Sequence, residues 1–385
     1  AGVRPWLNSS VSLIYLDYNR TTPLAPSVAE AMEPYWATHF MLPDQEHPYA
    51  QAIGEALESA RESVAFLVGC EPFEIVFTGG GTEANNLAII GTLREQPPGH
   101  VLVSALEHQS VVDSASSLAA LGWRVDSVPC DPLGQIDAGL VASRIQDDTR
   151  LVCVQLANPV LGTIQPVREI AEVCHRRGVL LHCDATQAIV KIPVDVGQLH
   201  ADMLAISGHK FYGPKGSGAL YVRRGLGLSP IAFGEPREMG LRPGAENIPA
   251  WIGLGAAASL ASRAATDSDS SLEQLCQRLV KGVLSSVNPP PRILADGLPR
   301  LPNTVSMEFS VSARKIQRAA RQLAVASPRS DNPPDEMTQV LRAIGCAPSE
   351  VARTIRFSVG WTTTRDQIDR AVELLADALD NSLSQ

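Results

Sequence analysis

The sequence predicts an α/β protein with a mainly parallel sheet and a smaller α+β region toward its C-terminus. From about residue 25 to residue 222, short β-rich apolar runs alternate with helical patterns. This alternation is typical of a parallel sheet that helices cover on both faces. A polar segment at residues 266–271 then interrupts the chain and is the clearest predicted domain boundary. Strands and helices no longer alternate regularly beyond it.

Apolar runs in the first region are predicted as strands. They cover residues 74–78, 100–104, 150–156, 179–184 and 203–207. The predicted helices between them repeat apolar residues at spacings of three and four. These helices cover residues 83–95, 111–122 and 167–178. Because ligands bind outside the carboxyl ends of the strands in such sheets, the residues that directly follow each run are candidates for a functional site.

The region after residue 265 mixes helices and strands. A long predicted helix from Glu246 to about Ala265 leads into it. Its own predicted elements include helices at 272–287 and 364–382 and strands at 304–310 and 354–360. We therefore predict a large α/β domain at residues 24–265 and a small α+β domain formed by residues 1–23 and 266–385.

Composition and charge exclude several classes of function. The formal net charge of -9 and the pI of about 5.4 argue against a nucleic-acid partner, because such binding needs a surplus of Lys and Arg on one face. The longest apolar run, around Ile248 to Ala261, falls short of the roughly 20 residues that span a bilayer, so no membrane segment is predicted.

The seven cysteines form no CxxC pair, which fits a reducing compartment. We expect a cytoplasmic location, or an organelle reached with a targeting peptide since removed, and predict no metal site.

A glycine run, TGGGTEANN at residues 78–86, follows one predicted strand and opens a helix. Glycine lets the backbone approach a phosphate closely, and the free N–H groups of a helix N-terminus favour the phosphate charge. Alone this pattern is weak evidence, since a glycine-rich turn is more often only a tight connection. It lacks the GK[ST] ending of a Walker loop.

Asp184 closes the apolar strand that begins the motif HCDATQA (182–188). A bare carboxylate would be costly there unless it is paired. A buried acid can keep a pyridinium nitrogen protonated, and the protonated ring then stabilises a substrate carbanion. If the motif stood alone, a helix N-cap would be the better interpretation.

Lys210 lies in SGHKFYGPKGSGALYV (207–222), directly after one predicted strand and ahead of the next. A lysine among apolar and aromatic residues has a lowered proton affinity and can form an imine. Ser207 and His209 can reach a phosphate from the same turn. No structural requirement explains Ser-Gly-His-Lys at a strand end.

Five ordered motifs together resemble the cysteine desulfurase and selenocysteine lyase family of class V aminotransferases. They are LDYNRTTP (16–23), GGGTEANN (79–86), HCDATQA (182–188), SGHKFYGPKGSGALYV (207–222) and IRFSVGWTTTRDQID (355–369). The resemblance runs from about Ile14 to Leu379. It implies the PLP-dependent transferase fold type I, the cofactor pyridoxal 5'-phosphate (PLP), and a homodimer with active sites at the subunit interface. The selenocysteine lyase branch is favoured by FYGP (211–214), RPGAEN (242–247) and RLPNT (300–304).

The resemblance implies which residues contact the cofactor ring. Lys210 would hold PLP as a Schiff base, and Asp184 would pair with the ring nitrogen. Gln187 would lie near the phenolic oxygen, and Asn158 would also face the cofactor. His108 would stack on the ring and serve as a second catalytic residue that shuttles protons.

Phosphate and substrate contacts are implied in the same way. The phosphate would be held by Gly81, Thr82, Ser207 and His209. Asn19 would contact the substrate. Arg356 would clamp the substrate α-carboxylate, a task that suits the fork of a guanidinium group.

One departure from the family concerns the nucleophile. Cysteine desulfurases attack the substrate sulfur with a loop cysteine, but the corresponding stretch here, residues 326–345, reads ASPRSDNPPDEMTQVLRAIG. An ungapped comparison places Ser330 at the nucleophile position, and a gap would place Pro328 or Arg329 there. A serine hydroxyl cannot take up sulfur as a persulfide, because it is far less acidic and nucleophilic than a thiol. Cys346 lies beyond the next helix and is a poor substitute.

Other departures fall near the same predicted site. The family's paired asparagines are Asn158 and Pro159, and a threonine expected at the partner subunit's cofactor phosphate is Ala245. An alanine of the N-terminal motif is Arg20, and an NPSS-type stretch reads LPDQ (42–45). Several changes near one site predict a changed substrate or weakened activity.

We therefore predict a PLP-dependent lyase of the cysteine desulfurase or selenocysteine lyase type, acting on a sulfur- or selenium-containing amino acid. Without a loop cysteine, elimination would release sulfide or selenide directly, and an acceptor protein for sulfur or selenium would be a further partner. Two alternatives stay open. One is another class V reaction, such as transamination or decarboxylation, in which Arg20 would meet an acidic substrate. The other is a catalytically weakened paralogue that acts as a scaffold.

Overall fold

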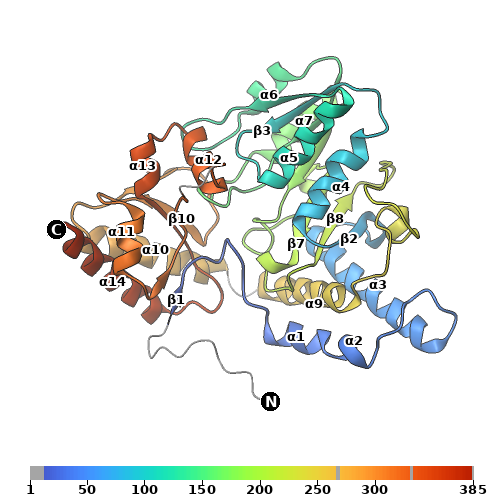
Figure 1. Ribbon diagram of the computed structural model, residues 1–385, viewed down its shortest axis with the longest axis horizontal. Coiled ribbons are helices and arrows are strands. Elements are labelled where there is room, and N and C mark those ends of the chain that lie inside the picture. The colour runs from blue at the N-terminus through green and yellow to red at the C-terminus, as the bar shows by residue number, and fades with distance from the viewer. Residues whose placement is uncertain (1–12, 266–268, 330–332, 384–385) are drawn as a thin grey trace.

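A seven-stranded sheet forms the centre of the computed structural model, which describes residues 13–265, 269–329 and 333–383 (Figure 1). The strand order is β2-β8-β7-β6-β5-β3-β4. Its strands are β2 (Ile75–Thr78), β3 (His100–Ser104), β4 (Arg124–Val128), β5 (Thr149–Cys153), β6 (Leu180–Asp184), β7 (Met203–Ser207) and β8 (Gly218–Val222). Strand β8 runs opposite to the other strands of this sheet. The prediction of an α/β fold with a mainly parallel sheet is confirmed.

Helices cover both faces of this sheet, as alternating side chains along a strand require. Ile75 and Phe77 of β2 pack into a core that includes residues of α3 and α9, whereas Val76 packs into a core with residues of α4 and α5. The helices of this part are α1 (Pro26–Met32), α2 (Pro34–Ala37), α3 (Pro48–Val68), α4 (Gly81–Leu93), α5 (Gln109–Ser117), α6 (Ala138–Arg144), α7 (Val167–Arg176), α8 (Val196–Leu199) and α9 (Ile248–Ala265). Among the described residues, no helix has the length and apolarity needed to cross a membrane.

The C-terminal part has its own core and two small sheets. Antiparallel pairing joins β12 (Thr354–Ser358), β10 (Thr304–Glu308) and β9 (Arg292–Ile293), and β1 (Ile14–Tyr15) pairs in parallel with β11 (Leu323–Ala324). The helices here are α10 (Asp269–Ser286), α11 (Ala313–Ala319), α12 (Glu336–Ala343), α13 (Pro348–Arg353) and α14 (Arg365–Leu383). Figure 1 shows this part beside the large sheet. The division of the chain into 24–265 and 1–23 plus 266–385 stays a prediction.

The strand directions bring distant motifs to one edge of the large sheet. Because β8 is antiparallel to both β2 and β7, the strands β2 and β7 point the same way, and β6, β5 and β3 are parallel to β7. The carboxyl ends of these strands therefore share one edge, where ligands bind in such folds. Thr78, Ser104, Cys153, Asp184 and Ser207 are the last residues of these strands.

Candidate active site

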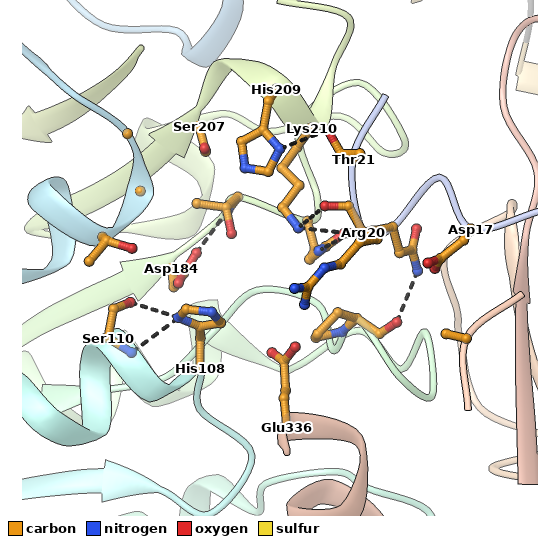
Figure 2. Close-up of a pocket in the computed structure, with 18 of the residues that line it drawn as sticks. Asp17, Arg20, Thr21, His108, Ser110, Asp184, Ser207, His209, Lys210 and Glu336 are labelled. Atoms are coloured by element: carbon orange, nitrogen blue, oxygen red, sulfur yellow. Dashed lines mark hydrogen bonds between the residues drawn. The ribbon is translucent and has the colours of Figure 1, made fainter. Parts of the chain in front are cut away.

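A cavity of about 920 Å³ opens at this edge of the sheet. Its walls come from the strand ends, from the N-terminal segment around Asn19 and from α12 (Figure 2). Most of the predicted site residues line it. They are Asn19, Gly81, Thr82, His108, Asp184, Gln187, Ser207, His209, Lys210 and Arg356.

Lys210 ends a short 3-10 turn that directly follows β7. Its Nζ donates to the carbonyl oxygens of Asn19, at 2.7 Å, and Arg20, at 3.2 Å. Burial lowers the pKa of Lys210 to about 8, with a further lowering by the positive charges of Arg356 and Arg20 and an opposing effect from Glu336 and Asp184. The amine is therefore far easier to deprotonate than an exposed lysine.

Asp184 is buried at the end of β6 and keeps its carboxylate paired. Asn85 Nδ2 donates to Oδ2 at 2.8 Å, and the Thr186 backbone N–H donates to Oδ1 at 2.9 Å. Because a carboxylate only accepts, the amide of Asn85 must turn its nitrogen toward Asp184. Its oxygen then lies 2.8 Å from Nε2 of the buried His182. Burial lowers the pKa of His182 to about 4, so this imidazole is neutral and donates one proton to Asn85.

His108 caps the N-terminus of α5 and connects to the same network. Its Nδ1 accepts from the Ser110 backbone N–H at 3.1 Å and lies 2.8 Å from Ser110 Oγ. Asn85 Nδ2 also donates to Ser110 Oγ at 2.9 Å, which leaves the hydroxyl hydrogen for His108. With Nδ1 accepting, a neutral His108 carries its proton on Nε2.

The glycine turn ahead of α4 lies against Ser207. Gly80 has a φ of 142°, which favours glycine, and a Cβ on Gly81 would lie 2.8 Å from Thr186 Cγ2 and 3.4 Å from Ser207 Cβ. His209 Nδ1 lies 3.1 Å from Thr21 Oγ1. Burial, then the charges of Lys210, Lys215 and Arg20, lower the pKa of His209 to about 4. A tight turn at a helix N-terminus beside several cations is suited to an anion such as a phosphate.

Gln187 is held by a buried lysine that the sequence motifs did not single out. Lys191 Nζ donates to Gln187 Oε1 at 2.7 Å and to Asn19 Oδ1 at 3.1 Å, and Gln187 Nε2 donates to the Asn19 carbonyl at 2.9 Å. Burial, with the positive charges of Lys210 and Arg356, lowers the pKa of Lys191 well below its ordinary value. The spacing of four between Gln187 and Lys191, which puts two residues on one face of a helical turn, was the available signal.

Asn19 has a different environment from the substrate contact that we expected. Its Nδ2 donates to the Pro159 carbonyl at 2.9 Å and to Thr304 Oγ1 at 2.8 Å. Its Oδ1 accepts from Lys191 and, at 3.2 Å, from Asn303 Nδ2. The side chain is therefore committed to protein partners, and the carbonyl holds Lys210.

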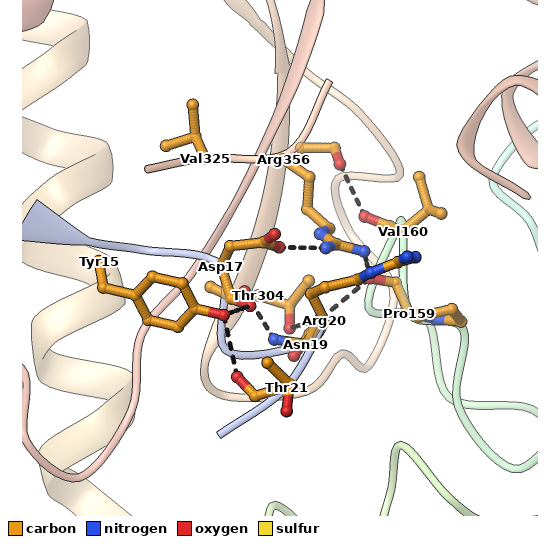
Figure 3. A network of polar contacts seen from close by, with 12 residues as sticks. Tyr15, Asp17, Asn19, Arg20, Thr21, Pro159, Val160, Thr304, Val325 and Arg356 are labelled. Carbon is orange, nitrogen blue, oxygen red and sulfur yellow. Dashed lines mark hydrogen bonds and ion pairs between the residues drawn. The ribbon is translucent and has the colours of Figure 1, made fainter. Parts of the chain in front are cut away.

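Arg356 lies on β12 at the margin of the cavity and is 5% exposed. Its Nη2 pairs with Asp17 Oδ1, and its Nη1 donates to the Pro159 carbonyl at 3.1 Å (Figure 3). Its buried Nε has no hydrogen-bond partner among the described residues. These contacts use two of the five N–H donors of the guanidinium, so others remain for a bound anion.

Asn158 does not belong to the cavity lining. It is fully buried, and its Oδ1 accepts from the backbone N–H groups of Val160 and Leu161, each at 2.9 Å. The amide oxygen therefore stabilises the turn at residues 158–162, whereas the buried Nδ2 has no hydrogen-bond partner among the described residues. The neighbouring Pro159 lines the cavity in its place.

Described residues of the stretch that we compared with the family's cysteine loop border the cavity on the side of α12. Ser330 lies outside the described residues. Arg329 and Glu336, on either side of it, line the cavity. No cysteine occurs among the described lining residues. Cys346 is half-buried beyond α12, and burial raises its pKa.

Comparisons with known proteins agree on one family. A family model described as aminotransferase class-V matches residues 14–371. The chain is 38% identical to cysteine desulfurase IscS 1 of Archaeoglobus fulgidus over 95% of its length and 97% of that protein. It is 37% identical to the cysteine desulfurase of Homo sapiens, covering 94% of this chain and 80% of that protein.

Solved structures extend this similarity to the whole fold. A NifS-like protein superposes with a TM-score of 0.88 at 29% identity, and the superposition covers 96% of this chain and 100% of that protein. SspA in complex with cysteine superposes with a TM-score of 0.79 at 32% identity, covering 90% of this chain and 98% of the other.

Proposed function

The chain belongs to the class-V aminotransferase family, as an enzyme of the cysteine desulfurase type, and we propose that it is a PLP-dependent lyase for a sulfur- or selenium-containing amino acid that works without a persulfide cysteine. The observation that carries the proposal is the placement of Lys210, with its lowered pKa, and Asp184 in one cavity. Both groups lie at the sheet edge where such folds bind ligands.

The cavity residues fit PLP as a cofactor. Lys210 offers the amine for the aldehyde, Asp184 the acid for the ring nitrogen, and Gln187 an amide for the phenolic oxygen. The glycine turn at residues 79–81, which lines the cavity where α4 begins, fits a phosphate that Thr82, Ser207 and His209 would also hold. When bound, PLP supplies an electron-withdrawing ring that stabilises negative charge at the substrate α-carbon.

The protein side chains would then position the substrate and move its protons. Arg356 binds the α-carboxylate, using the donor capacity left beside its contacts with Asp17 and Pro159. Lys210 accepts the proton from the α-carbon, as its lowered pKa permits. His108 carries a proton on Nε2 and delivers it to the leaving sulfur.

Elimination follows from the absence of a thiol on the described cavity wall. The bond between Cβ and sulfur breaks, the sulfur leaves with the electron pair and takes up a proton, and water hydrolyses the resulting enamine. For cysteine the balance is cysteine plus water giving pyruvate, ammonia and hydrogen sulfide, with no external oxidant or reductant.

A product analysis tests this proposal. The PLP-loaded protein is mixed with L-cysteine or L-selenocysteine, and pyruvate, alanine and sulfide or selenide are measured together. We expect pyruvate and sulfide in equal amounts, loss of both with Lys210→Ala, and no change with the control Cys346→Ser. Alanine together with a protein-bound persulfide would overturn the elimination route. A panel of other amino acids that changed the cofactor spectrum, without any effect of cysteine, would favour another class V reaction.

We also propose that the protein acts as a homodimer, as its family resemblance implies. Light scattering of the PLP-loaded protein gives the mass in solution directly. A mass near 41.1 kDa, that of one chain, would contradict the dimer.

A further inference from the structure

We propose that the outer end of the cavity binds a leaving group that is itself zwitterionic, so that the preferred substrate is a disulfide-linked amino acid such as cystine and not free cysteine. This inference rests on the proposed lyase function. It is carried by two opposite charges, on Arg20 and Glu336, that enter the cavity from different elements (Figure 2).

Arg20 is tied to the catalytic centre through its backbone. Its carbonyl accepts from Lys210 Nζ at 3.2 Å, so the residue cannot lie far from the cofactor-binding amine. Its side chain is exposed and lines the cavity. Within the described part of the chain, no hydrogen bond or ion pair involves its guanidinium.

Glu336 approaches the same space from α12. It is the first residue of that helix, and Asp335 ahead of it caps the helix by accepting from the Thr338 N–H at 2.9 Å. The cap fixes where the helix starts and therefore where Glu336 stands. Glu336 is half-buried, and its charge is felt at Lys210, whose pKa it raises. Its carboxylate has no ion-pair or hydrogen-bond partner among the described residues.

Several other charged side chains of the cavity already have partners. Arg356 is engaged by Asp17 and Pro159, Glu83 pairs with Arg242 at 3.1 Å, and Asp335 caps α12. Arg20 and Glu336 instead face the cavity without satisfying each other. A ligand that carries one anion and one cation would pair with both.

An α-amino acid head is the simplest group with that charge pattern. In cystine, the head that reacts would place its carboxylate at Arg356. The second head, beyond the disulfide, would offer its carboxylate to Arg20 and its ammonium to Glu336. Free cysteine ends at the sulfur and leaves both side chains unmatched. Cystine therefore gains charge-assisted hydrogen bonds that free cysteine cannot make.

The reaction on cystine balances without an added reductant. The Cβ–S bond of the bound half breaks, and the disulfide bond stays intact. Cystine plus water gives pyruvate, ammonia and thiocysteine, whose terminal sulfur takes the electron pair and one proton. The second head remains attached to the departing sulfur, so the outer end of the cavity binds the leaving group throughout.

Three disulfides that contain cysteine test which charged group of the ligand each of the two residues binds. Cystine carries both groups on its far half, the mixed disulfide with 3-mercaptopropionate carries only the carboxylate, and the mixed disulfide with cysteamine carries only the ammonium. We expect Arg20→Ala to lower kcat/KM about tenfold for the two disulfides with a far carboxylate, a size typical of one lost charge-assisted hydrogen bond. Glu336→Gln should likewise lower kcat/KM about tenfold for the two disulfides whose far half carries an ammonium group. Free cysteine should be affected far less by either change.

The control and a binding measurement separate this inference from the lyase proposal. Arg168→Ala removes an exposed arginine on α7 that pairs with Glu172, outside the cavity, and should leave all four rates unchanged. Calorimetry of cystine with the PLP-loaded Lys210→Ala protein reports binding without turnover, and adding Arg20→Ala should weaken it about tenfold.

Each outcome decides one of the two proposals. Turnover of cysteine that equals or exceeds that of cystine, or equal effects of both variants on every substrate, would overturn the zwitterion site. No turnover of any sulfur amino acid would overturn the lyase function, and the calorimetry would still decide whether the outer charges bind a second amino acid head.

Discussion

Asn85 donates from its side-chain amide to the carboxylate of Asp184, with 2.8 Å between Nδ2 and Oδ2. The same amide nitrogen donates to Ser110, which contacts His108, while its oxygen lies against the neutral His182. One buried side chain on α4 therefore orients both the acid expected at the cofactor nitrogen and the histidine expected above its ring.

Replacing Asn85 should disturb the catalytic centre without touching the cofactor contacts directly. We expect Asn85→Leu to lower kcat at least about tenfold and the free energy of unfolding by about 2 kcal/mol, because buried partners lose their hydrogen bonds. Asn86→Ala is the matched control, since Asn86 is the next residue on the same helix and its amide donates to the Thr82 carbonyl on the same helix. Steady-state rates and urea unfolding of both variants check this. Equal effects of the two changes would contradict the role given to Asn85.

The lowered pKa of Lys210 should be visible in how the protein without cofactor captures PLP. The amine is protonated below about pH 8 and free above it, so the capture rate should rise with pH and level off just above 8. Glu336→Gln should move the midpoint down and Arg20→Ala should move it up, because those charges raise and lower this pKa respectively. Stopped-flow absorbance measures the rate. A rate that keeps rising toward the ordinary lysine pKa of about 10.4 would contradict the burial of this amine.

Lys191 should make stability depend on pH in the alkaline range. Its pKa is lowered in the folded state. Between the folded-state pKa and the unfolded-state pKa, the unfolded chain therefore binds more protons than the folded chain. Stability from this group therefore rises with pH until the unfolded lysine also titrates, by up to about 1.4 kcal/mol per pH unit. We expect the slope between pH 8 and 10 to fall in Lys191→Met and to stay unchanged in Lys281→Met, a change at an exposed lysine of α10. Chemical denaturation across this range gives the slopes, and a slope that Lys191→Met leaves intact would rule out a neutral buried amine.

A ligand carboxylate at Arg356 should compensate for the loss of the Asp17 charge in a variant. Asp17→Asn removes the anion beside a buried guanidinium, which should destabilise the protein by about 3 kcal/mol. A carboxylate ligand can then supply the missing charge, so cysteine should raise the melting temperature more in this variant than in the unmodified protein. Asp369→Asn, in the exposed pair with Arg278, should change neither stability nor the ligand effect appreciably. Equal ligand shifts in all three proteins would contradict the assignment of Arg356.

Local sequence patterns predicted the parts of the fold and site that depend on strand ends. The apolar run that ends at Asp184 and the one that precedes Lys210 each stop where a ligand site forms in a parallel sheet, and both residues line the cavity. The strand β4 was not predicted, because only Val128 of it is fully buried and its other side chains do not form an apolar run.

Contacts between distant segments of the chain could not be predicted from the sequence. The Asp17 to Arg356 pair joins the N-terminal segment to a C-terminal strand, and Asn85 reaches Asp184 across nearly one hundred positions, with a separation of 99. Such pairs arise from packing of complete elements, which no local pattern encodes. Asn158 is expected at the cofactor from the match to the family's paired asparagines, and no local pattern indicates that its Oδ1 accepts from the backbone of its own turn.

Lys210 is the amine expected to bind the cofactor covalently. Borohydride reduction of the PLP-loaded protein fixes the cofactor to its lysine, and peptide mapping by mass spectrometry then locates it. The expected result is one PLP on the peptide that contains Lys210, and none in Lys210→Ala. A cofactor fixed to Lys191 or Lys215, or a protein that carries none after loading, would contradict it.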